Sequence, residues 1–370
     1  MPEKVNRLKR IPSLDGFRAI SIILVLFAHS RFSSGFPQQI SSVAQQGAFG
    51  VNIFFVISGF LITYLLLKEN EDSGAISVKS FYIRRAFRII PVYSLNILFI
   101  FLMSLLISID VSRGNFLHAI TFTSNFDAHN SMVFLHYWSL SVEEQFYLFW
   151  PAILIFLGRH LKPIAIAFVL YACVARVISY KFPGHDPVLL APFFSNSDSI
   201  FIGAFGAIIF FEDSNIVKLR IFRSYLAQLA VIGIIILFKY FVSHGILGKI
   251  SLPFSNTVAG CGVLFLLLCY IEPSESPVYK LLNSRVIVHI GILSYSLYIW
   301  QEFFFVEKFN NIFFTFPYNW ALIYIVALAS YYLWEKPFLK LKDRFHNKVP
   351  VPLNTPLAEA TYQTQVSKRA

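Results

Sequence analysis

Long apolar runs alternate with short polar segments along nearly the whole chain. A helix rises 1.5 Å per residue, so about 20 apolar residues cross the roughly 30 Å hydrocarbon layer of a membrane. We therefore predict an all-α fold, a polytopic membrane helix bundle of about ten transmembrane helices. The predicted spans are residues 19–34, 48–67, 89–108, 136–157, 163–180, 198–211, 225–242, 253–271, 286–305 and 319–334.

Composition supports the same class. Hydrophobic residues make up 56% of the 370 positions and charged residues only 14%, a balance that a soluble domain of this length could not cover with polar surface. No small-residue cleavage site follows the first apolar run, which predicts a retained helix. The three cysteines lie inside apolar runs, so neither a disulfide framework nor a zinc site is predicted.

The net charge of +11 is distributed unevenly between the predicted loops. With the N-terminus inside, 24 of the 31 lysines and arginines fall on the inner side and 7 on the other. This asymmetry follows the positive-inside rule and predicts that both termini are cytoplasmic. The basic excess is thus explained by topology and contact with membrane lipid, with an anionic ligand as a second role, and nucleic acid is not expected as a partner.

We divide the chain into three parts. Residues 1–18 form a basic cytoplasmic N-terminus, residues 19–337 form one membrane domain, and residues 338–370 form a basic cytoplasmic tail. The tail lacks apolar periodicity beyond Lys348 and is predicted to be disordered. Glycine-rich phosphate loops, nucleophile elbows and metal-ligand clusters are absent from the sequence, so no metal is predicted.

The first apolar run contains two ionisable residues, Arg18 and His29, that suggest a functional site. Arg18 and His29 are eleven residues apart, about three helical turns, so their side chains point to the same side of one helix. Roughly 16 Å of helix separates them and places His29 near the middle of the hydrocarbon layer. A titratable imidazole at that depth predicts a functional role.

Three arginines precede the third run. Arg84 and Arg88 are four residues apart and share one helix face, with Arg85 beside them. Guanidinium groups suit bidentate binding of phosphate. Anchoring against anionic lipid explains the same pattern equally well, so both interpretations stay open.

Two adjacent carboxylates, Glu143 and Glu144, interrupt the fourth run, where a buried charge is costly and marks a functional site by default. Their directions differ by about 100°, so they cannot share one role. Glu143 comes near the predicted depth of His29 from the opposite direction, and we expect it to act in or support catalysis. The alternative is a structural carboxylate paired with Arg18 or Arg176.

Further polar residues occur in the second and ninth runs. Asn52 and Ser58 stand among small residues, a pattern that tight helix packing explains and that also suits substrate contact. Tyr295, Tyr298 and Glu302 form one helical stripe that could line a cavity, with an interfacial aromatic belt as the competing interpretation.

The remaining runs offer less chemistry. Asp198 opens the sixth span, where a helix N-terminal cap explains it as well as a substrate contact does. The seventh and eighth runs, which include Lys239, have lipid-facing aliphatic character, and we expect no chemistry from them.

From Ile11 to about Pro337 the chain resembles the acyltransferase-3 family of integral membrane acyltransferases, through six motifs in the family's order. They are an Arg-x10-His opening, a Gly-Val-Asp-Leu-Phe-Phe-Val-Ser-Gly-Phe-like block, an Arg-x-x-Arg block, a Trp-Ser-Leu-x-x-Glu-Glu-Gln-Phe-Tyr block, a Ser-Tyr-Ser-Leu-Tyr-x-Trp block and a closing Glu-x-Pro. They fall at Arg18 to His29, Gly50 to Phe60, Arg85 to Arg88, Trp138 to Tyr147, Ser294 to Trp300, and Glu335 to Pro337.

Two positions depart from the family pattern. Asn52 stands where the family often has aspartate, which weakens that position as an acid or base. No arginine closely precedes Asp198, which weakens a binding role there.

The resemblance implies transfer of an acyl group, usually acetyl, from cytoplasmic acyl-CoA to a hydroxyl on a carbohydrate or lipid-linked glycan. The acceptor would lie at the opposite face of a bacterial cytoplasmic (inner) membrane. The chain resembles the stand-alone type without an extra hydrolase-like domain, so we expect direct transfer to the acceptor. A covalent acyl-enzyme on a serine or tyrosine stays open.

The expected roles follow. Arg84, Arg85 and Arg88 bind the CoA phosphates. His29 is the general base, Glu143 orients it or balances its charge, and Arg18 supports the same face. The predicted substrate-binding residues are Asn52, Ser58, Glu144, Tyr295, Tyr298 and Gln301.

A transporter is the alternative. Buried His29 and Glu143 would then be relay groups in a proton-coupled exporter of a glycan or small metabolite. Such proteins often show two similar halves, and no such repeat occurs in this sequence. Binding of CoA discriminates, because an exporter has no reason to bind it.

Overall fold

The computed structural model describes residues 11, 13–107, 109–127, 129–182, 193, 196–306 and 311–343. In this part of the chain all regular structure is helical. The α-helices are α1 (Leu14–Ser30), α2 (Ser41–Gln45), α3 (Gly50–Ser73), α4 (Val78–Leu106), α5 (Arg113–Ile120), α6 (Tyr137–Leu157), α7 (Leu161–Lys181), α9 (Asp198–Glu212), α10 (Arg220–Arg223), α11 (Tyr225–Ser243), α12 (Gly248–Cys269), α13 (Pro277–Leu282), α14 (Arg285–Phe305), α15 (Tyr318–Ala329) and α16 (Lys336–Asp343).

Short helical turns connect several of these elements. They are the 3-10 helices η1 (Gln38–Ile40), η2 (Gln46–Phe49), η3 (Ser124–Phe126), η4 (Met132–Phe134), η5 (Gly158–His160), η7 (Ser214–Lys218) and η8 (Ile312–Phe314), and the π-helix η9 (Ser330–Glu335) between α15 and α16.

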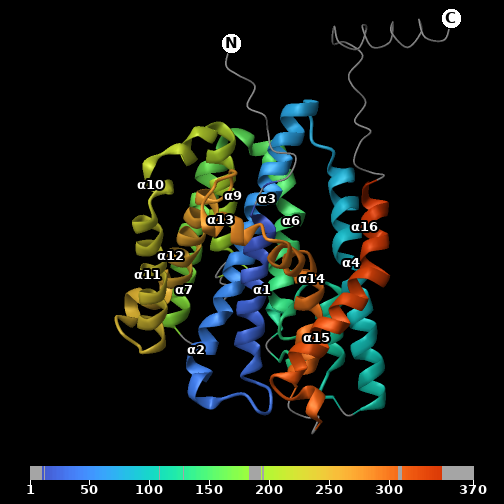
Figure 1. Ribbon diagram of the computed structural model, residues 1–370. Helices are drawn as coiled ribbons and strands as arrows, with labels where there is room; N and C mark the ends of the chain where they lie inside the picture. Colours follow the sequence, from blue (N-terminus) through green and yellow to red (C-terminus); the bar gives the residue numbers. More distant parts are fainter. Residues whose placement is uncertain are drawn as a thin grey trace, which may run out of the picture.

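The long helices lie side by side in one bundle (Figure 1). Successive long helices alternate in direction, so that α1 runs down the view, α3 returns, and α4 runs down again. We call the end of the bundle at which α1 begins the upper end, and the end at which α1 stops the lower end. The upper end thus collects the start of α4 and the end of α3, and the lower end collects the starts of α6 and α9.

Within the described residues, five helical stretches are long and apolar enough to cross a membrane, as predicted for a membrane bundle. They are Gln38–Ser73, Val78–Leu106, Met132–Lys181, Tyr225–Ser243 and Gly248–Cys269. Every predicted span overlaps one or more described helices. The all-helical membrane class is therefore confirmed, whereas the number of ten spans and the side on which the termini lie remain predictions.

Helix α1 begins earlier and ends earlier than its predicted span. It starts at Leu14 because Asn283 holds the preceding residue: Asn283 Oδ1 accepts the Ser13 backbone N–H at 3.1 Å, and its Nδ2 donates to Ser13 Oγ at 2.8 Å. The shift places His29 in the last turn of the helix. Its predicted depth near the middle of the hydrocarbon layer stays a prediction.

Helix α4 begins at Val78, eleven residues before its predicted span. The Ser77 hydroxyl accepts the Ser80 backbone N–H at 3.3 Å and caps this start. The three-arginine segment is therefore the first part of α4 and not a loop. It holds Arg84, Arg85 and Arg88 on a rigid element at the upper end of the bundle.

Glycines let α3 and α9 approach at backbone distance. A side chain at Gly59 would overlap the carbonyl of Ile200, and one at Gly203 would overlap the carbonyl of Val56. This is the close contact between small residues that the second run predicted. It fixes the face that α3 turns toward α9.

The predicted terminal segments are only partly described. Residues 1–10 of the expected basic N-terminus and residues 344–370 of the expected tail lie outside the described residues.

Candidate active site

A cavity of about 470 Å³ at the upper end is lined by four arginines. They are Arg18, Arg84, Arg85 and Arg88, and the wall also contains Asp15 and Glu69. The first run and the three-arginine segment, which are separate in the sequence, thus meet in one place. Four guanidinium groups against two carboxylates give the cavity a net positive wall that suits an anionic ligand.

Three of these arginines have carboxylate partners. Arg84 Nη2 lies 2.8 Å from Glu69 Oε2, and Arg88 Nη1 lies 2.7 Å from Glu335 Oε1. Glu335 is fully buried. The glutamate of the closing Glu-x-Pro motif therefore forms an ion pair with Arg88 of the three-arginine segment. The sequence spacing did not predict this contact.

Arg18 pairs more loosely within its own helix, where its Nη1 lies 3.3 Å from Asp15 Oδ1. Arg85 differs from the other three. Its guanidinium lies 5.2 Å from the ring centroid of Tyr147 and 6.0 Å from that of Phe81, and it forms no ion pair within the described residues. Arg85 thus lies against aromatic rings and shares the central cavity wall with Glu143 and Glu144.

A smaller central cavity of about 90 Å³ continues from the arginine cavity, with which it shares Arg18, Arg85 and Arg88. Its other polar wall residues come from α3, α6 and α14: Ser58, Ser139, Glu143, Glu144, Tyr147, Ser294, Tyr295 and Tyr298. Most residues predicted to bind substrate are therefore brought together here, although they are widely separated in the sequence.

Glu143 faces α3 and not His29. Its Oε1 accepts a hydrogen bond from Ser58 Oγ at 2.7 Å. No ion pair joins it to Arg18 or Arg176 in the part of the chain that the structure describes. The expected pairing of Glu143 with His29 is therefore corrected, because His29 turns toward α14. Whether Glu143 acts in catalysis stays a proposal.

His29 meets a different carboxylate. Its Nδ1 lies 2.7 Å from Glu302 Oε1. This contact joins the last turn of α1 to the last turn of α14 at the lower end. The Glu302 side chain is 1% exposed and that of His29 is 17% exposed. The sequence placed Glu302 on a cavity stripe but not beside His29. A carboxylate in an apolar run was the signal that could have marked it.

Several buried polar groups surround this pair. His136 lies within electrostatic range of His29 and Glu302, and both of its ring nitrogens lack a hydrogen-bond partner among the described residues. The Gln301 amide is equally buried and equally without a partner there. Buried polar atoms are normally satisfied, so these groups mark a place for a polar ligand or water.

Two tyrosines of α14 line the central cavity. The Tyr298 hydroxyl lies 2.5 Å from Ser139 Oγ and donates to the His136 carbonyl at 3.2 Å. The Tyr295 hydroxyl donates to the Ile89 carbonyl at 2.9 Å. The cavity thus reaches Tyr298, and the His29 partner on α14 follows one turn later.

Glu144 stands in the wall between the central cavity and a mainly apolar one of about 920 Å³. The larger cavity lies between α4 and α6 and also contacts Arg85 and Tyr147. The two adjacent glutamates therefore have different surroundings, as their directions predicted.

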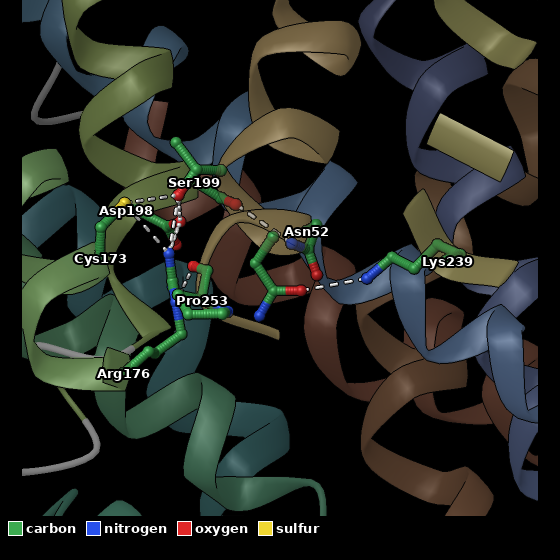
Figure 2. A network of polar contacts seen from close by, with 9 residues as sticks. Asn52, Cys173, Arg176, Asp198, Ser199, Lys239 and Pro253 are labelled. Carbon is green, nitrogen blue, oxygen red and sulfur yellow. Dashed lines mark hydrogen bonds and ion pairs between the residues drawn. The ribbon is translucent and has the colours of Figure 1, made fainter. Parts of the chain in front are cut away.

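Asn52 and Asp198 belong to a separate polar network (Figure 2). Asn52 Nδ2 donates to Ser199 Oγ at 3.2 Å. Asp198 Oδ2 accepts from Arg176 Nη2 at 2.8 Å and from Thr257 Oγ1 at 2.6 Å. Asp198 is thus an ion-pair partner, and the arginine missing just before it is supplied by α7.

The sequence matches the acyltransferase domain of the acyltransferase-3 family over residues 11–334. The chain belongs to the acyltransferase-3 family. The resemblance in its motifs is thereby confirmed. The four arginines of the upper cavity, the polar residues of the central cavity and the His29–Glu302 pair all lie within the matched range.

Three bacterial relatives of this acyltransferase-3 chain illustrate the family. A Staphylococcus aureus (strain COL) protein with the provisional name of an O-acetyltransferase is 29% identical, over 91% of this chain and 58% of its own length. Peptidoglycan O-acetyltransferase OatA of Listeria monocytogenes is 32% identical, over 79% of this chain and 49% of its own. A Bacillus subtilis protein provisionally named a peptidoglycan O-acetyltransferase is 27% identical, over 91% and 56%.

The chain thus spans about half the length of these curated relatives. No solved structure matches it. No group of histidine, cysteine, aspartate or glutamate side chains suited to a metal ion occurs among the described residues.

Proposed function

We propose that this protein is a membrane O-acetyltransferase that moves an acetyl group from cytoplasmic acyl-CoA to a hydroxyl of a glycan on the opposite face of the bacterial cytoplasmic membrane. Family membership and the O-acetyltransferase names of the relatives support the reaction class. The observation that carries the proposal is the His29–Glu302 contact at the lower end of a bundle whose upper end holds an arginine cavity.

The donor binds at the upper end in this proposal. CoA carries several phosphates, and the arginine cavity offers four guanidinium groups, of which Arg85 has no carboxylate partner within the described residues. The central cavity continues from the arginines toward Tyr298 and gives the thioester arm a path inward. Bidentate guanidinium–phosphate contacts would fix the nucleotide end.

His29 is the general base of the proposed reaction. The Glu302 carboxylate, 2.7 Å from Nδ1, favours the neutral imidazole that carries its proton on Nδ1. The Nε2 lone pair is then left to take the proton of the acceptor hydroxyl. The hydroxyl oxygen attacks the thioester carbonyl carbon, and the tetrahedral intermediate collapses with loss of the CoA thiolate. The imidazolium returns the proton to that thiolate, which leaves His29 neutral for the next cycle.

The topology proposed with this reaction has ten spans between residues 19 and 337 and both basic ends, residues 1–18 and 338–370, in the cytoplasm. The excess of lysine and arginine at the upper end supports this orientation. The donor cavity would then open to cytoplasmic acyl-CoA, and His29 would lie toward the acceptor.

Glycan analysis tests the function. Surface glycans from cells lacking the gene would be compared by NMR and mass spectrometry after complementation with the intact protein or with His29→Ala at equal membrane abundance. We expect the O-acetyl signal to return only with the intact protein, since a general base contributes about 10²- to 10⁴-fold. His244→Ala is the matched control, because His244 is exposed and follows α11. Full acetylation by the His29→Ala variant would exclude the general-base role.

Donor binding is tested separately with the purified protein. Arg85→Gln should weaken binding of CoA, because it removes the guanidinium that lacks a carboxylate partner. Arg159→Gln, in η5 outside the cavity, should leave binding unchanged. Equal CoA affinity of the two variants would contradict the donor site and reopen the exporter alternative.

A further inference from the structure

A polar pocket of about 210 Å³ lies at the lower end of the bundle and is distinct from the three cavities described above. It lies where α3 and α6 begin and where α11 and α12 approach each other. Its polar wall residues are Gln45, Gln46, Asn52, Asn196, Lys239 and Asn256. The sequence predicted only lipid-facing character for the seventh and eighth runs, so the inward position of Lys239 is a correction.

The ammonium of Lys239 points into this pocket. Its Nζ donates to Asn256 Oδ1 at 3.0 Å, a bond that Figure 2 marks as a dashed line from Lys239. The same Nζ lies 5.8 Å from the ring centroid of Phe49. A lysine four residues from the end of a membrane helix usually extends toward water. This one turns inward, where one amide oxygen satisfies one of its three donor hydrogens.

The charge of Lys239 is not balanced inside the pocket. No carboxylate forms an ion pair with it within the described residues. The nearby Asp198 is already bound by Arg176 at 2.8 Å and by Thr257 at 2.6 Å. Lys239 is only partly exposed, and an ammonium in that position without an ion-pair partner is costly in a membrane bundle. An anionic ligand would offset that cost.

The rest of the wall suits a sugar ring. Side-chain amides supply both donors and acceptors, which is what sugar hydroxyls need. The indole of Trp138 adds a broad apolar face against which ring C–H groups can pack. Phe55 holds that indole edge-on, with the ring centroids 5.9 Å apart.

The pocket and the central cavity share a wall. Val51 and Phe55 of α3 line both spaces. A sugar bound among the amides would therefore lie one residue layer from the cavity that contains Glu143 and Tyr298. This position suits a neighbouring part of the same acceptor glycan.

We infer that this pocket is an acceptor subsite for an acidic sugar residue, whose carboxylate or phosphate pairs with Lys239. The inference rests on the proposed function, because it names the substrate class of the same reaction. Amides and Trp138 recognise the ring, and Lys239 selects the charge.

Binding of simple probes tests the subsite without the reaction. The full-length protein in nanodiscs would be titrated with a glucuronic-acid-containing disaccharide, a neutral disaccharide of the same linkage, and glucose 1-phosphate. We expect at least about tenfold tighter binding of an acidic probe than of the neutral one, since charge-assisted hydrogen bonds are the strong ones. Comparison of the uronate with the sugar phosphate shows whether the pocket prefers a carboxylate or a phosphate.

Variants of Lys239 test whether this side chain causes the preference for acidic over neutral probes. Lys239→Met should bind the acidic and neutral probes equally, and Lys239→Arg should keep the preference. Lys249→Met is the matched control, because Lys249 is exposed in α12. Unchanged CoA affinity in all four proteins shows that each variant is folded.

Two results separate the inference from the proposed function. A protein that acetylates glycans but binds acidic and neutral probes equally overturns the subsite alone, as does a Lys239→Met variant that keeps the preference. A protein that binds the uronate through Lys239 but acetylates no glycan overturns the proposed reaction and leaves only the acidic-sugar binding at Lys239 in place.

Discussion

At the residue scale, the contact between His29 and Glu302 determines which imidazole nitrogen is available. Their 2.7 Å separation holds Nδ1 against a carboxylate that is 1% exposed. A carboxylate in this position orients the ring and stabilises the imidazolium that forms during proton transfer. Glu302 is thus a positioning residue for His29 in the proposed reaction.

We therefore predict that Glu302→Gln lowers acetyl transfer by about 10²- to 10⁴-fold, because the amide can hold the wrong tautomer and does not balance the imidazolium charge. CoA affinity should not change, since the contact lies at the end opposite the arginine cavity. Transfer rates and CoA titrations of the purified protein would measure both. Glu275→Gln, at an exposed surface position, serves as the control. Normal transfer by Glu302→Gln would contradict the role.

A second residue-scale prediction concerns Glu335. It is fully buried, pairs with Arg88 at 2.7 Å and accepts from Ser296 Oγ at 2.8 Å. Glu335→Gln leaves a partly buried guanidinium without its counter-ion and should cost about 3–5 kcal/mol. Thermal unfolding in detergent should show a clearly lowered midpoint. Glu212→Gln removes an exposed pair with Lys162 and should cost only about 0–1 kcal/mol. Equal midpoints for the two variants would argue against a structural role of the buried pair.

At the element scale, the bundle depends on backbone contact between helices. Gly59 of α3 and Gly203 of α9 each face a carbonyl of the other helix with no room for a side chain. Through this contact α9 sets the rotation of α3, and α3 carries residues of both the central cavity and the polar pocket. Helix packing and site geometry are therefore linked.

Substitution of one glycine tests that link. Gly59→Val should separate α3 from α9 and destabilise the protein by about 1–3 kcal/mol or more, because overpacked side chains force the backbone to move. Both the unfolding midpoint and acetyl transfer should fall. Gly233→Val in α11 is the control, since nothing lies within 4 Å of a Cβ at that position. A Gly59→Val protein as stable as the control would show that the two helices can separate without cost.

At the scale of the whole molecule, the proposed reaction needs the upper and lower ends to face opposite sides of the membrane. The turn between α3 and α4 lies at the upper end, and α5 lies at the lower end. The excess of basic residues predicts that the upper end is cytoplasmic. Donor and acceptor would then enter from opposite sides and meet inside the bundle.

Cysteine labelling in intact cells tests this orientation. Gly114→Cys in α5 should react with a membrane-impermeant maleimide, whereas Ala75→Cys, between α3 and α4, should react only after the cells are opened. The unchanged protein, with native Cys173, Cys261 and Cys269, gives the background. Labelling of Ala75→Cys from outside would reverse the topology and with it the side of the donor.

The sequence by itself determined the long helices and most of the chemically important positions. Apolar run length located every predicted span on a described helix, because a helix needs a fixed number of residues to cross a hydrocarbon layer. Periodicity within one helix also placed Arg84 and Arg88 on one face of α4 and separated the directions of Glu143 and Glu144. These are local properties, which backbone hydrogen bonds fix without reference to other helices.

Only the tertiary structure decided which side chains meet across helices. In the structure His29 contacts Glu302 and not Glu143, and Arg176 forms the ion pair with Asp198. The side chain of Lys239 points toward a polar pocket, where it donates to Asn256. Periodicity says which residues share a face, but not which neighbour that face meets. Neighbours are set by the fit of small residues against backbone and by the balance of buried charges, both of which depend on residues far apart in the chain.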